Sequence, residues 1–248
     1  MDIEEIRTIE RSNVVILGNF NPAIIHPEWL DRNQVLPPPE VRDITEAKKE
    51  RETDLEGIKV KLVASNVFVS GAETRLSLPS YRITVTPGKF DAMALKREKH
   101  RELCEFVAST FKILEHTPVE AMGINFISSL KFSEHAVDLM HRYFCAEAKT
   151  LTSVFGERYL LDGRVRYDYE NFKVTVRFEL KEEKDEIGID FNYHMKLTEK
   201  EGTKELIENL LENFEPTMGN ADKVIRGLFG EPVDGGENSE KSGKNRNV

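Results

Sequence analysis

The stretch FKVTVRFELKEEKDEIGIDFNYHMKL, residues 172–197, decides the fold class. Apolar and polar side chains alternate through residues 172–180 and again through residues 187–197. This period of two is typical of strands with one buried and one wet face, as in an antiparallel sheet. The six consecutive charged residues 181–186 lie between the two runs and predict a hairpin loop. We expect one buried face on this hairpin, formed by Val174, Val176, Phe178, Ile189, Phe191 and Tyr193.

The residues after this hairpin predict a helix that covers its apolar face. Thr203 is a candidate N-cap, and the apolar residues that follow recur at helical spacing. The hairpin is the nearest apolar surface that this helix could cover. A separate, shorter helix is expected just after it. The two apolar stripes are Leu206, Ile207, Leu210, Leu211 and Phe214 for the first helix, and Val224, Ile225, Leu228 and Phe229 for the second.

The residues before the hairpin predict strands at 121–132 and 164–169, with a helix at 133–149 between them. The clearest helical period of the chain precedes these elements. Asp91 is its candidate N-cap and Pro118 prevents its continuation. One face of this helix is expected to be buried, and it comprises Leu103, Phe106, Val107, Thr110, Phe111 and Leu114.

The first part of the chain predicts strands, a short helix and a connector. A short helix is expected at residues 27–30, where a proline occupies an early helical position. Ten of the fifteen residues in 42–56 are charged, so we expect an exposed connection there. The expected strands are 13–20, 58–70, 73–78 and 81–86.

These elements predict an α+β fold in which long amphipathic helices pack on one face of one or more antiparallel sheets. Residues 1–57 would hold the first strand, the short helix and the connector, and residues 231–248 have the composition of a disordered tail. Residues 58–150 and 151–230 would each form an α+β half. The similarity of YRITV (81–85) to FKVTV (172–176) is compatible with a duplicated βββα half, and equally with a single unrepeated sheet.

The composition predicts an acidic cytoplasmic protein, which we take to be of prokaryotic type. The chain has 248 residues, with 35 Lys and Arg against 44 Asp and Glu, so its formal net charge is −9. This charge argues against generic binding of duplex DNA. The first ten residues are acidic and lack the apolar core of a secretory signal, and no apolar run is long enough to span a membrane.

The common catalytic and cofactor-binding motifs are absent from the sequence. It contains no GxxxxGK[ST], GxGxxG after a strand, HExxH, CxxC or GxSxG. Cys104 and Cys145 have no activating neighbour at a suitable spacing and are expected to be structural thiols. We therefore expect neither a cofactor nor a metal ion.

A polar row on the wet face of the hairpin is the first candidate site. Asp190, Asn192 and His194 project from the same side of one strand. A carboxylate, an amide and an imidazole could hold a metal ion or perform acid–base chemistry. The alternative is a solvated face with ion pairs across the strands. The facing residues would be Lys173, Thr175, Arg177 and Glu179 on one strand and Arg164, Arg166 and Asp168 on another.

A basic cluster near the start of the main helix is the second candidate. It comprises Lys96, Arg97, Lys99 and Arg101, with His100 among them. Positive charge there opposes the helix dipole, so the cluster does not stabilise the helix. It could be a solvated face, or it could bind an acidic protein or nucleic acid.

The segment from Asn21 to Trp29 is the third candidate. Asn21, His26 and Glu28 lie close in sequence to Trp29, which is the only tryptophan. The residues fit a turn that leads into a helix begun by proline. They also fit a partner-binding surface, because tryptophan is a frequent interface anchor.

The sequence thus favours a non-catalytic protein that binds another macromolecule, which we expect to be another protein. The low count of recognisable catalytic groups and the charge-rich surface support this prediction. The alternatives are an enzyme with an acid–base or metal site on the polar sheet face, and nucleic-acid binding through the basic cluster.

Overall fold

The computed structural model describes residues 3–6, 9–36, 48–55, 58–132, 162–181, 186–200 and 202–229, together with Ala136, Met140 and Phe144. The expected helix at 133–149 and the expected tail at 231–248 lie outside these residues, apart from the three single positions. The described helices are α1 (Pro27–Arg32), α3 (His100–Ile113) and α6 (Gly202–Phe229), with short 3-10 turns η1 (Pro22–Ile24) and η2 (Arg97–Lys99). The described strands are β1 (Ile3–Ile6), β2 (Arg11–Gly18), β3 (Lys48–Leu55), β4 (Ile58–Ser65), β5 (Val67–Val69), β6 (Thr74–Ser77), β7 (Tyr81–Thr86), β8 (Lys89–Ala94), β9 (Val119–Phe132), β10 (Asp162–Tyr169), β11 (Phe172–Lys181) and β12 (Glu186–Lys196).

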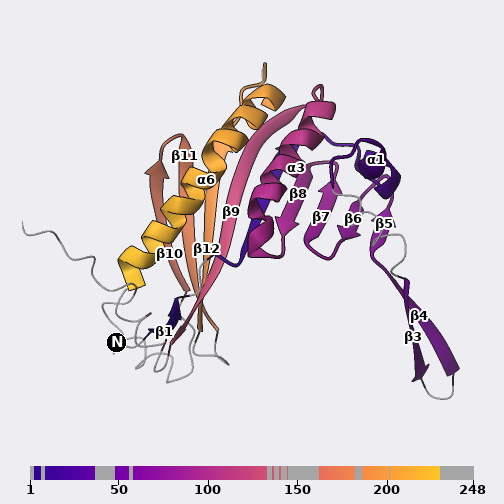
Figure 1. Cartoon of the computed structure of the whole chain (residues 1–248), viewed down its shortest axis with the longest axis horizontal. Helices are drawn as coiled ribbons and strands as arrows, with labels where there is room; N and C mark the ends of the chain where they lie inside the picture. Colours follow the sequence, from indigo (N-terminus) through magenta and orange to yellow (C-terminus); the bar gives the residue numbers. More distant parts are fainter. Residues whose placement is uncertain are drawn as a thin grey trace, which may run out of the picture.

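Ten of these strands form one antiparallel sheet (Figure 1). Its order is β10-β11-β12-β9-β2-β8-β7-β6-β5, and β1 pairs with β9 outside this path. The pair β2–β9 therefore lies in the middle, with β5–β8 on one side and β10–β12 on the other. Strands β3 and β4 pair only with each other among the described strands, and Figure 1 shows them projecting beyond the β5 edge.

Helices α3 and α6 lie on the same side of the sheet and pack against each other (Figure 1). Aromatic rings fill the space below them. Phe90 and Phe111 meet edge to face at 5.3 Å, and Phe126 contacts Phe214 in the same way at 5.6 Å. The predicted α+β fold with an antiparallel sheet is confirmed. None of the described helices has the apolar length that a membrane crossing would need.

The hairpin that decided the fold class is formed as predicted. Val176 lies opposite Phe191, and Phe178 lies opposite Ile189. All four side chains are buried. The charged residues where the two strands meet the loop also interact, since Lys181 Nζ is 2.9 Å from Glu186 Oε1.

The region around Asp91 differs from the prediction. Asp91 is not a helix N-cap but lies in strand β8, and α3 begins at His100. In β8, buried Phe90, Ala92 and Ala94 alternate with half-buried residues, which is a strand period. The turn at residues 87–88 joins β7 to β8 as a hairpin, because Thr86 lies opposite Lys89.

Three smaller predictions are also wrong. The expected strand 58–70 is divided into β4 and β5, and the expected connector 42–56 contains β3. The two C-terminal helices are a single helix, α6, which continues through Pro216.

Helix α6 survives the proline because its buried stripe continues on both sides. Leu206, Leu210 and Phe214 are buried before Pro216, and Thr217, Ala221, Ile225 and Phe229 are buried after it. Proline removes one backbone donor. Next to the proline, the Thr217 hydroxyl donates to the Asn213 carbonyl at 2.7 Å. Leu211, which was expected in the buried stripe, is 51% exposed.

Candidate functional site

The face of the sheet opposite α3 and α6, here called the open face, is not covered by any described helix. Its side chains alternate with the buried ones along β2, β6, β7, β8 and β11. In β11, for example, Lys173, Thr175 and Arg177 are exposed or half-buried, while Val174 and Val176 between them are buried. The open face is therefore the wet face that the alternation predicts.

The strand register arranges open-face residues in rows that cross the sheet. One row has three asparagines at its centre, Asn13 on β2, Asn125 on β9 and Asn192 on β12, and we call these the asparagine row. Asn13 Nδ2 donates to Asp91 Oδ1 at 3.1 Å, and Asn192 Nδ2 donates to Asn125 Oδ1. The asparagine row is the middle of a longer row of directly opposed residues. From β7 to β10, this longer row is Arg82, Met93, Asn13, Asn125, Asn192, Thr175 and Arg166, and Ser77 on β6 lies opposite Arg82.

A hollow of about 460 Å³ lies beside the asparagine row. Three arginines line it together with the asparagines, and we call it the arginine hollow. Arg164 and Arg166 come from β10 and Arg177 from β11. In the described part of the chain, no carboxylate forms an ion pair with any of these three guanidinium groups, although Lys173 on the same face pairs with Asp168 at 2.8 Å.

The register makes this arrangement electrostatically costly. Arg164 lies directly opposite Arg177. Like charges in directly opposed positions destabilise a sheet. On the other side of Arg177 lies Asp190, the only acidic residue among those lining the hollow. Burial raises the pKa of Asp190, and the nearby Arg177 acts in the opposite direction.

The three residues of the polar row all lie on β12, each opposite a residue of β11. Asp190, Asn192 and His194 face Arg177, Thr175 and Lys173 respectively. Four residues along a strand span about 13 Å, so Asp190 and His194 lie far apart. Two ligands of one metal ion must both lie within about 2–2.5 Å of it. The described residues contain no group of three or more His, Cys, Asp and Glu side chains suited to a metal ion.

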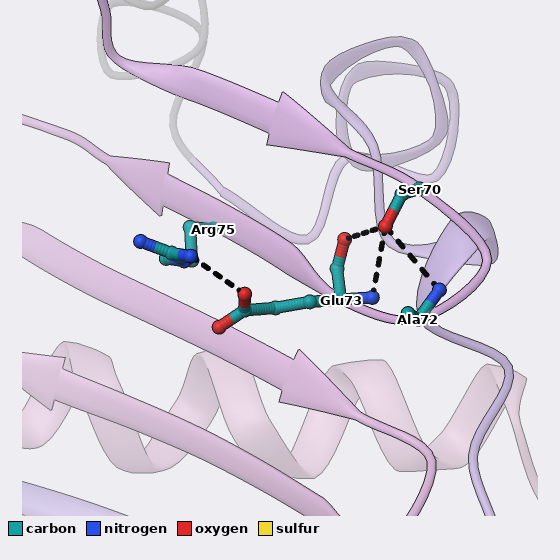
Figure 2. A network of polar contacts seen from close by, with 4 residues as sticks. All are labelled: Ser70, Ala72, Glu73 and Arg75. Atoms are coloured by element: carbon teal, nitrogen blue, oxygen red, sulfur yellow. Dashed lines mark hydrogen bonds and ion pairs between the residues drawn. The ribbon is translucent and has the colours of Figure 1, made fainter.

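Arg75 on β6, at the opposite end of the sheet, is an arginine that has both a carboxylate and an aromatic partner. Arg75 Nη2 is 2.7 Å from Glu73 Oε2, and the hydrogen bond with this carboxylate raises the pKa of the guanidinium (Figure 2). The same group lies 5.5 Å from the ring centre of exposed Phe68. Ser70 supports Glu73, since its hydroxyl accepts a hydrogen bond from the Glu73 backbone N–H at 3.0 Å (Figure 2). The arginines of the hollow have no such carboxylate partner among the described residues.

The predicted basic cluster lies at η2 and the start of α3, away from the open face. Lys96, Arg97 and Arg101 are exposed there. Lys99 Nζ is 2.7 Å from Glu102 Oε2, and Arg101 Nε is 3.3 Å from Glu105 Oε1. Glutamates thus neutralise part of the cluster. His100 is buried, and this burial lowers its pKa, which disfavours a positive charge.

The turn from Asn21 to Trp29 is held by local contacts. Asn21 Oδ1 accepts a hydrogen bond from the Ala23 N–H at 3.2 Å, and His26 Nδ1 is 2.7 Å from Glu28 Oε2. Trp29 is partly buried and packs against the core. These contacts support the turn interpretation of this segment, and the structure does not bring it together with the asparagine row.

Asn13, Asn125 and Arg82 were not predicted as site residues. Arg82 lies in a strand that alternates in sequence, YRITVT, so a signal for its face existed. Asn13 and Asn125 lie in strands without clear alternation, and no such signal marked them. Their adjacency to Asn192 and Arg166 depends on strand order, which alternation does not encode.

Comparison with known proteins adds no relative: no family model matches the chain, and no curated protein matches it.

Proposed function

We propose that this chain is a non-catalytic protein that binds another macromolecule through the open face of its sheet. The observation that carries the proposal is the continuous row from Arg82 to Arg166. It crosses seven neighbouring strands. At about 4.8 Å between strands, the row is about 29 Å long, which exceeds most small molecules.

The chemistry of this row suits binding. Asparagine amides donate and accept hydrogen bonds at neutral pH without titrating. Together with the arginines, they can recognise polar groups on a partner. Acid–base catalysis requires groups within hydrogen-bond reach of one reacting atom. The separation of about 13 Å between Asp190 and His194 disfavours the alternative of an enzyme built on this pair.

The order of the strands supports a further part of the proposal, a duplicated α+β half. In each half one strand of the central pair, β2 or β9, is bordered by the last strand of a hairpin series, β8 or β12. A helix follows directly after that last strand, α3 in one half and α6 in the other. A duplication would explain why the open face extends to both sides of the central pair.

The proposal is tested by covering the middle of the open face. In the variant Asn192→Trp, an indole replaces an exposed amide at the centre of the row. The tagged full-length chain is incubated with a cell extract and cross-linked. Captured proteins are identified by mass spectrometry and captured nucleic acids by sequencing. We expect a partner enriched by the wild type and reduced about tenfold or more by the substitution.

The matched control is Glu208→Trp, which places the same indole on the exposed side of α6. It should capture the same partner as the wild type. If Asn192→Trp captures the same material as the control, the open face is not the binding surface.

A further inference from the structure

We infer that the arginine hollow binds a phosphate group of a nucleic-acid strand that lies along the asparagine row. This inference rests on the proposed function and specifies its partner. It differs from the prediction based on the basic cluster, because Arg164, Arg166 and Arg177 lie on the opposite side of the sheet from α3.

The first argument is the excess of positive charge in the hollow. The chain as a whole has a net charge of −9. Even so, three guanidinium groups gather at one hollow, and Asp190, opposite Arg177, is the only acidic residue that lines it. Among the described residues, none of the three arginines forms an ion pair with a carboxylate. Arg164 and Arg177 are also directly opposed. An anion in the hollow would remove this repulsion, and arginine binds phosphate through two parallel hydrogen bonds.

The second argument concerns the size and shape of the site. The hollow of about 460 Å³ is larger than a phosphate group and lies open on the sheet. It continues into the asparagine row, whose amides are about 4.8 Å apart. Amides provide both donors and acceptors for sugars and base edges, while arginines bind phosphates. On the other side of the asparagines from the hollow, exposed Arg82 on β7 offers a further contact to the same nucleic-acid strand.

The test uses the full chain and labelled 20-nucleotide probes of mixed sequence, as single-stranded DNA, single-stranded RNA and duplex DNA. Binding is measured by fluorescence anisotropy between 50 and 300 mM NaCl. For a single strand, each phosphate contact contributes about 0.7 to the slope of log affinity against log salt. In the variant Arg164→Gln/Arg166→Gln/Arg177→Gln, we expect affinity at 50 mM salt to fall at least tenfold and the slope to become shallower by about 2.

The control variant Lys112→Gln/Lys204→Gln/Lys223→Gln removes the same charge from exposed positions of α3 and α6 that lie outside the basic cluster. It should change affinity less than about threefold. Urea denaturation confirms that both variants fold like the wild type. The probe that binds best identifies the form of nucleic acid.

Three results would overturn the inference. The first is an equal loss of affinity in the two variants, which would indicate that the net charge of the protein, and not the arginine hollow, determines the affinity. The second is binding of inorganic phosphate in calorimetry without binding of any probe. The third is capture of a protein by the open face while no probe binds, which would leave the proposed function intact.

Discussion

Phe191 and Asn192 are neighbours in sequence with opposite environments. Phe191 is 1% exposed and lies below the helices, whereas Asn192 is exposed on the open face. This contrast is a direct consequence of the strand period of two. A register slip of β12 by one residue would exchange the two side chains and bury Asn192.

The two residues therefore test the register. Phe191→Ala removes a large side chain from a packed core and should lower the free energy of unfolding by about 3–5 kcal/mol. Asn192→Ala removes one exposed hydrogen bond to Asn125 and should change it by about 0.5 kcal/mol. Urea denaturation of both variants measures the difference. Greater damage from Asn192→Ala would mean that the sheet faces the other way.

At the scale of elements, two tyrosine hydroxyls share one acceptor on α6, and these two hydrogen bonds hold the second half of the helix against the sheet. The hydroxyls of Tyr167 on β10 and Tyr193 on β12 both donate to Asn220 Oδ1 of α6, each at 2.7 Å. Burial raises the pKa of both tyrosines, so both remain protonated donors. The contact lies beyond Pro216, where the helix has lost one of its own hydrogen bonds.

Removing this acceptor should destabilise the protein. Asn220→Ala removes the acceptor that the Tyr167 and Tyr193 hydroxyls share and leaves the two hydroxyls only each other, which should cost about 1–3 kcal/mol of unfolding free energy because Tyr193 is fully buried. In a Tyr193→Phe background the same substitution should cost less, because the buried Tyr193 hydroxyl, which needs this acceptor, is absent. Denaturation of the two single variants and the double variant measures this coupling. Additive effects would show that Asn220 acts without Tyr193.

At the scale of the whole molecule, the described halves share one sheet and one helical layer. Strands β2 and β9 pair along eight positions, from Arg11 opposite Ile127 to Gly18 opposite Val119. Helices α3 and α6 contact each other above this pair. Separating the halves would expose both the strand edges and the core, so we expect them to unfold together.

This expectation can be checked with two probes on opposite sides of the central strand pair. Trp29, the only tryptophan, lies in α1 on the β5–β8 side of the sheet, packs against the core and reports through its fluorescence (Figure 1). The tyrosines around Tyr193, on the β10–β12 side, contribute to near-ultraviolet circular dichroism. We expect coincident urea transitions with one midpoint. An earlier transition of Trp29 would show that the two sides of the sheet unfold separately.

Short-range patterns determined most of the individual elements. The alternation in residues 172–180 and 187–197 was sufficient for the hairpin, its register and its buried face, because a short charged loop leaves few other pairings. Strand β8 was missed since its six residues follow a two-residue turn, and the helical pattern that begins at His100 appeared to extend back to Asp91. Helix α6 was divided in error because proline usually ends a helix, whereas burial on both sides of Pro216 outweighs that cost here.

The sequence by itself therefore determined the α+β class, the antiparallel hairpin and the sides of β11 and β12 that meet water, because these depend on neighbours along the chain. Only the tertiary structure decided that β2, β9 and β12 lie side by side, which brings Asn13, Asn125 and Asn192 into one row. It also placed Arg164 on β10 directly opposite Arg177 on the neighbouring strand β11. Strand order is selected by how the whole apolar surface is buried under α3 and α6, and that energy belongs to the complete fold rather than to any segment of it.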